Sequence, residues 1–147
     1  MKKLTLQNTI TTAALLAALN YADMALAHTI PDSLGAAAGA VDAFQTTCKP
    51  NAAGKTAQLV TRVKAAKKTP LVSVQAFKGK VASHSTDAVG GNAAYSPLAK
   101  TIAGDGVYTV LVDKSGAGAI NYVLDVHCQT LTGAHTEQPE PTQLQNN

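Results

Sequence analysis

The chain has 147 residues, of which 12 are Lys or Arg and 9 are Asp or Glu, so its formal net charge is +3 at pH 7. This length predicts a single domain, because a second core normally needs a longer chain. With 4 His, 2 Cys and no Trp, the sequence has few residues for specialised chemistry. These features argue against a large enzyme, a disordered polyelectrolyte and a dedicated binder of nucleic acid.

Residues 1–27 have the pattern of a secretory signal peptide. Two lysines precede a stretch rich in Leu, Ile, Thr and Ala, and Ala25-Leu26-Ala27 places small residues at the two positions that a signal peptidase inspects. A retained membrane anchor needs about 20 strongly apolar residues, whereas polar residues interrupt this stretch. We therefore expect bacterial secretion to the periplasm or the extracellular space, and a mature chain that begins at His28 and has no transmembrane segment.

Residues 28–40 precede the predicted domain. They contain Pro31, Gly35 and a run of alanines, so we expect an extended N-terminal arm, with one short helix as the alternative. The domain itself is expected over residues 41–129.

The first half of this domain contains three candidate strands. Over residues 44–48, Phe44, Thr46 and Cys48 alternate with two polar residues, which predicts the first strand. Residues 57–65 and 71–77 are two further candidates, and Pro70 at the start of the latter sacrifices no ladder hydrogen bond. We expect these two strands to form a hairpin.

The second half of the domain continues the pattern. Shorter strands are expected over residues 80–84 and 98–102, and a β-branched and aromatic run over residues 107–113 predicts another strand. The clearest alternation in the chain places on one face Ile120, Tyr122, Leu124, Val126 and Cys128. A Ser-Gly-Ala-Gly turn between these last two strands predicts a second hairpin.

Together these segments predict an all-β domain. About six to eight short strands, separated by turn signals at nearly regular spacing, are typical of a two-sheet β-sandwich, immunoglobulin-like or jelly-roll-like. Residues 130–147 contain two prolines and several Gln and Asn but almost nothing to bury. We expect them to be a disordered C-terminal tail.

The two cysteines, Cys48 and Cys128, both lie in the predicted mature chain. In an oxidising compartment, two thiols in one small domain normally pair, so a disulfide is expected between them. A catalytic thiolate or a metal thiolate is the alternative, and it needs a reducing environment or further Cys ligands.

Two stretches of the chain are similar to a known domain family. Gly106-Val-Tyr-Thr-Val-Leu-Val-Asp-Lys and Asn121-Tyr-Val-Leu-Asp-Val, with the glycine turn between them, resemble the closing hairpin of the pre-peptidase C-terminal domains. Val41-Asp-Ala-Phe-Gln is similar to the opening strand of the same family. These domains are β-sandwiches appended to many secreted bacterial hydrolases, so the resemblance implies a sandwich fold and an accessory role.

An N-terminal histidine is the most suggestive feature for metal chemistry. Cleavage after Ala27 would leave His28 with a free α-amine and an imidazole, which together chelate copper in secreted proteins that contain a histidine brace. The candidate partners are His84, His127 and His135, of which His127 lies on a predicted strand and His135 in the predicted tail. We therefore expect any metal site to use His28, His127 and His84, with copper as the metal and zinc as the alternative. The other interpretation is that these are ordinary surface histidines that bind no metal.

The usual signatures of catalysis do not occur. The sequence has no Gly-x-Ser-x-Gly elbow, no His-Glu-x-x-His and no phosphate-binding glycine loop, so we expect no enzymatic activity. Asp87 with residues 90–92 offers oxygen ligands for calcium, but Gly-Asn loops usually only turn the chain. Basic residues on or beside the predicted hairpin over 57–77 form a strip, and they are Arg62, Lys64, Lys67, Lys68, Lys78 and Lys80. Contact with an anionic polymer or a membrane surface is one interpretation, but lysines on strands are also the ordinary way to keep a sheet edge soluble.

Three functions stay open. The first is a small exported, non-catalytic binding or accessory protein, whose partner is an unknown protein or small ligand. The second is a periplasmic copper-binding protein that uses His28. The third is a structural subunit in which residues 28–40 add as a strand to a neighbouring sandwich, so that the chain self-assembles.

Overall fold

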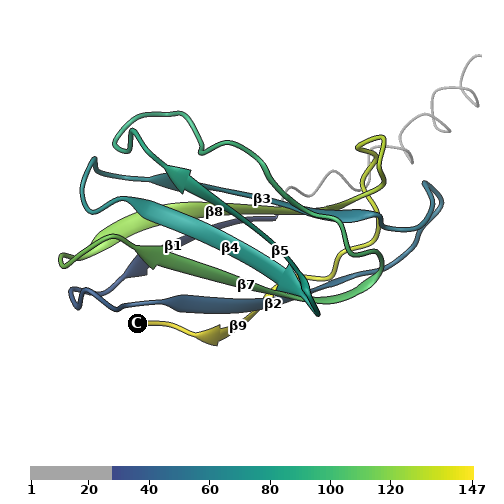
Figure 1. The fold of residues 1–147 in the computed structure, drawn as a ribbon, viewed down its shortest axis with the longest axis horizontal. Coiled ribbons are helices and arrows are strands. Elements are labelled where there is room, and N and C mark those ends of the chain that lie inside the picture. Colours follow the sequence, from purple (N-terminus) through teal and green to yellow (C-terminus); the bar gives the residue numbers. More distant parts are fainter. Residues whose placement is uncertain (1–27) are drawn as a thin grey trace, which may run out of the picture.

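The computed structural model describes residues 28–147, and the predicted signal peptide, residues 1–27, lies outside the described residues. Within the described part, nine strands form two antiparallel sheets that pack face to face (Figure 1). The all-β sandwich that the sequence predicts is confirmed. Residues 28–147 contain no helix of the length and apolarity needed to cross a membrane.

The two sheets divide the strands as follows. The four-stranded sheet has the order β1 (His28–Leu34), β8 (Ile120–Gln129), β3 (Gln58–Ala65) and β6 (Ala99–Thr101). The five-stranded sheet has the order β5 (Val81–Asp87), β4 (Val72–Lys78), β7 (Gly106–Lys114), β2 (Asp42–Cys48) and β9 (Thr142–Gln145).

The core lies between the sheets and follows the predicted alternation. Tyr122, Leu124 and Val126 of β8 are buried, and so are Tyr108 and Val110 of β7. Burying such side chains stabilises the fold by roughly 1.5 to 3 kcal/mol for each aliphatic or aromatic residue. The face assignment predicted for residues 120–128 is therefore confirmed.

Both predicted hairpins are wrong in their pairing. β3 pairs with β8 and β6, whereas β4 pairs with β5 and β7, so the connection between β3 and β4 crosses from one sheet to the other. The connection between β7 and β8 crosses back in the same way. The alternation of apolar and polar residues shows which face of a strand is buried, but not which strand lies next to it. Two consecutive strands bury their apolar faces in the same core whether they pair in one sheet or lie in opposite sheets. The tight hairpin in this region joins β4 and β5 through Gly79, whose φ is +59°.

Residues 28–40 are an integral part of the sandwich and not a separate arm. β1 pairs antiparallel with β8 along its whole length, with Ile30 opposite Leu124. Ile30 and Leu34 pack on the core, while Pro31 is tolerated because β1 is an edge strand. The alternative prediction of a short helix is also wrong, because the rest of this segment contains only bends and turns.

The predicted disorder of residues 130–147 is wrong as well. β9 pairs with β2, and the last residue is fixed where Asn147 N–H donates to Asp42 Oδ1 over 2.8 Å. Earlier in the segment, the Gln138 side chain accepts from Cys128 N–H and donates to the Val126 carbonyl. The segment buries little apolar surface, so its composition suggests disorder, but hydrogen bonds to strand edges hold it in place.

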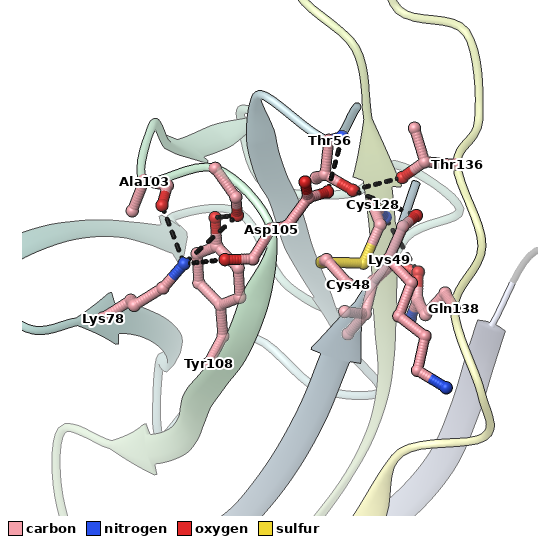
Figure 2. The surroundings of a disulfide bond; sticks show 12 residues. Cys48, Lys49, Thr56, Lys78, Ala103, Asp105, Tyr108, Cys128, Thr136 and Gln138 are labelled. Atoms are coloured by element: carbon pink, nitrogen blue, oxygen red, sulfur yellow. Dashed lines mark hydrogen bonds between the residues drawn. A yellow bond between two sulfur atoms is a disulfide. The ribbon is translucent and has the colours of Figure 1, made fainter. Parts of the chain in front are cut away.

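The predicted disulfide is confirmed. Cys48 at the end of β2 is joined to Cys128 near the end of β8, with a Cα to Cα distance of 5.5 Å. The bond therefore ties the two sheets together at one end of the sandwich (Figure 2).

A half-buried ammonium group lies close to this end. Figure 2 shows the Lys78 side chain beside the Tyr108 ring, with its Nζ donating to the carbonyl oxygens of Ala103, Gly104 and Asp105. Lys78 therefore fixes the connection between β6 and β7, and it is not part of a basic surface strip.

Candidate functional site

The outer face of the four-stranded sheet carries a charged cluster around Asp125. This residue of β8 is only 3% exposed, yet it lies on the face of β8 that turns away from the core. Arg62 Nε on β3 donates to Asp125 Oδ2 over 2.5 Å, and His127 Nε2 lies 2.6 Å from Asp125 Oδ1. Both oxygens of the Asp125 carboxylate thus have a partner, the Arg62 guanidinium on one side and the His127 ring on the other.

The pairing has a clear electrostatic consequence. Burial alone would raise the pKa of the Asp125 carboxyl, but hydrogen bonds and charge from His127 and Arg62 outweigh it and lower this pKa below its ordinary value. Asp125 therefore stays an anion that accepts both hydrogen bonds.

His127 has one occupied and one free ring nitrogen. Because a carboxylate can only accept, Nε2 of His127 carries the proton that faces Asp125. In the neutral ring Nδ1 then bears a lone pair, and Nδ1 is buried without a hydrogen-bond partner among the described residues. The His135 ring lies next to this imidazole, with the ring centres 4.8 Å apart and the two planes at 81°.

His135 reaches this position through a turn at residues 130–134. Gly133 N–H donates to the Thr130 carbonyl, and the returning chain pairs His135 with Gln129. Partial burial and the neighbouring His127 lower the pKa of His135 below its ordinary value. The lowered pKa favours the neutral form of the His135 ring.

An aromatic side chain extends the cluster along β3. The Arg62 guanidinium lies 4.3 Å from the Tyr95 ring centre, and the Lys64 ammonium lies 4.8 Å from it. Tyr95 is positioned by its neighbour Ser96, which exchanges hydrogen bonds with the Val63 backbone.

A shallow hollow of about 130 Å³ opens next to Lys64. Its lining consists of Lys64, Ala65, Ala66, Asn92, Asn121, Tyr122 and Val123. The loop that carries Asn92 packs tightly on the chain after β3, because a Cβ at Gly90 would lie 2.2 Å from the Lys67 carbonyl oxygen. This side of the hollow is therefore held rigidly.

The predicted calcium loop has a structural role. The Asp87 carboxylate accepts from the backbone N–H groups of Ala65, Val89 and Gly90. Its oxygens are thus used to join the loop to β3, and we do not propose them as calcium ligands.

The structure does not assemble the predicted metal set. His28 is opposite Val126 in the ladder, so its ring lies on the core side of the sheet, where Nδ1 is 3.2 Å from Glu140 Oε2. His127 lies on the other face, and His84 is on the five-stranded sheet opposite Gln75. Between residues 28 and 147, no three His, Cys, Asp or Glu side chains converge to hold a metal ion.

His135 is named among the candidate partners, but its position beside His127 is not predicted from the sequence. Its segment is polar and rich in proline, which predicts a tail and leaves the histidine unplaced. The signal that points to its position is the Thr-Gly pair at residues 132–133, because a glycine directly after a strand is typical of a chain that turns back.

Comparison with protein families, curated proteins and solved structures found no match to this chain. The resemblance to the pre-peptidase C-terminal domains therefore stays a prediction.

Proposed function

We propose that this chain is an exported, non-catalytic binding protein, and that it captures a small carboxylate on the outer face of the four-stranded sheet. The observation that carries the proposal is the hollow whose lining includes Lys64, Asn92 and Asn121, with the Lys64 ammonium also lying over the Tyr95 ring. A small concave site with a few polar groups is the common form of a ligand site.

The charge balance explains the preference for an anion. Arg62 is paired with Asp125, so its positive charge is compensated, whereas the Lys64 ammonium lies over the Tyr95 ring and forms no ion pair within residues 28–147. The connection after β3 adds Lys67 and Lys68, which are exposed beside the hollow. The amide N–H groups of Asn92 and Asn121 supply donors for carboxylate oxygens.

Nuclear magnetic resonance titration tests this proposal. Acetate, lactate and succinate are the probes, and acetamide is the neutral control. We expect the carboxylates, and not acetamide, to shift the backbone signals of Lys64, Asn92 and Asn121.

A matched pair of variants separates a site from general charge attraction. Lys64→Met should abolish the shifts, while Lys100→Met should preserve them, because Lys100 lies exposed on β6 of the same sheet, outside the hollow. Equal losses in the two variants, or no shifts at the hollow, would overturn the proposed site.

Export is the second part of the proposal, and the intact mass of the protein tests it. A product that begins at His28 supports processing after Ala27, and a retained leader contradicts it. The disulfide supports an oxidising compartment.

Strand addition by residues 28–40 has less support. β1 is already paired with β8 of its own chain from His28 to Leu34, so addition to a neighbour would require this pairing to break. A polymer in size-exclusion chromatography would favour that function over the binding protein.

A further inference from the structure

We propose that His127 and His135 together bind one divalent transition-metal ion, zinc(II) or copper(II), on the outer face of the four-stranded sheet. This site differs from the brace expected around His28, because it uses neither the α-amine nor the His28 ring. It also lies apart from the residues that line the carboxylate hollow.

The state of His127 is the first step. Its Nε2 faces Asp125 at 2.6 Å, which leaves Nδ1 as the nitrogen with the lone pair. A carboxylate that fixes the tautomer of a histidine and orients its ring is the usual outer partner of a metal-binding imidazole. Asp125 is therefore a positioning residue, and the unpartnered Nδ1 is the metal-binding atom.

The spacing of the two rings is the second step. In a tetrahedral site the metal lies about 2 Å from each ligand nitrogen and about 3 Å from each ring centre, so two ring centres are about 5 Å apart. The centres of His127 and His135 are 4.8 Å apart. The separation of the rings is therefore compatible with two ligands of one metal ion.

Access to the site is the third step. His127 Nδ1 is buried, whereas His135 lies in the exposed segment after β8. An ion therefore reaches Nδ1 from the side of His135, when that exposed ring turns. Since no third His, Cys, Asp or Glu ligand converges in residues 28–147, water completes the coordination. Imidazole suits both zinc and copper, and copper(II) is held more tightly at a given site.

Zinc(II) alone is the probe for the test, because it is diamagnetic and permits resonance assignment of each histidine ring. Before addition, the nitrogen spectrum of His127 should show the tautomer protonated at Nε2. On addition of zinc(II) to the oxidised full chain, ring signals of His127 and His135 should shift together. No shift at either ring would overturn the proposal.

Calorimetric titration of variants supplies the second measurement. His135→Gln, in an exposed segment, should weaken zinc(II) binding by about tenfold or more, the size of effect seen when a metal site is damaged. His28→Gln and His84→Gln are the controls and should bind as the unmodified chain does. If His135→Gln binds equally well, or if His28→Gln alone loses binding, the site is not at His127 and His135.

Discussion

A hydrogen bond across the core gives the sharpest test of how the two sheets are joined. Tyr122 on β8 donates through its hydroxyl to Asp42 Oδ2 on β2 over 2.7 Å. Asp42 is fully buried, and Tyr122 is 2% exposed. Tyr122→Phe keeps the ring but leaves one oxygen of a buried acid without a donor. We expect a loss of about 1.5 to 3 kcal/mol at pH 7, the range for hydrogen bonds to charged groups.

The same bond predicts the response to alkali. Burial, together with the hydrogen bond to Asp42 and its charge, raises the pKa of Tyr122 above the ordinary value. Above about pH 10 the tyrosine of the unfolded chain ionises while Tyr122 in the folded chain keeps its proton. Stability therefore falls with rising pH, by up to about 1.4 kcal/mol per pH unit. Burial also raises the pKa of Tyr108, which adds a second contribution of the same sign.

Urea unfolding at pH 7, 9, 10 and 11, followed by circular dichroism with the disulfide intact, measures both effects. The gap in free energy of unfolding between the unmodified chain and Tyr122→Phe should be largest at pH 7 and shrink above about pH 10. Tyr95→Phe is the control, since Tyr95 lies outside the core cluster. A gap near zero at pH 7, or one that stays constant to pH 11, would refute this account of the bond.

Two further predictions concern the core and the disulfide. Leu124→Ala should lower the free energy of unfolding by about 2 to 4 kcal/mol through lost burial and a residual cavity. Val123→Ala should lower it less, because the Val123 side chain is half-buried on the outer face. Equal losses in urea unfolding would contradict the face assignment. Replacing both Cys48 and Cys128 by Ala should cost about 4 to 5 kcal/mol, because the bond spans 80 residues of sequence. A loss under about 1 kcal/mol would show that the unfolded chain is little constrained by this bond.

The sequence predicts strands well and their partners poorly. The alternation over residues 120–128 is a local property, so it identifies the strand and its buried face, and it places Cys128 toward the core. Pairing depends on contacts between distant segments, and for that reason the short connections after β3 and β7 are mistaken for hairpin turns.

The two ends of the described chain fail for a different physical reason. Pro31 and the alanines after it are not typical of a strand, so β1 is not predicted. In this short edge strand only Ile30 and Leu34 pack on the core. Residues 142–145 bury no side chain, and only their backbone pairs with β2. Composition measures what a segment can bury, and therefore it does not predict order that comes from hydrogen bonds.

In the candidate site, one contact follows from the local sequence pattern and the others come from distant segments. Asp125 and His127 alternate with the predicted core residues of β8, so the same alternation puts both on the outer face, where the structure places them side by side. Arg62 joins them from β3 and His135 from beyond β8, and neither contact follows from spacing along the chain.

The position of β8 in its sheet affects when the protein can fold. β8 lies between β1 and β3, so the four-stranded sheet has no continuous ladder until residues 120–129 have been made. Cys128, the partner of Cys48, also comes late in the chain. A chain emerging from the ribosome therefore cannot complete the four-stranded half of its core before residues 120–129 have been made, because non-local strand pairing forms only after both partners are present. Such late assembly is what a polypeptide needs if it is threaded through a membrane channel before it folds.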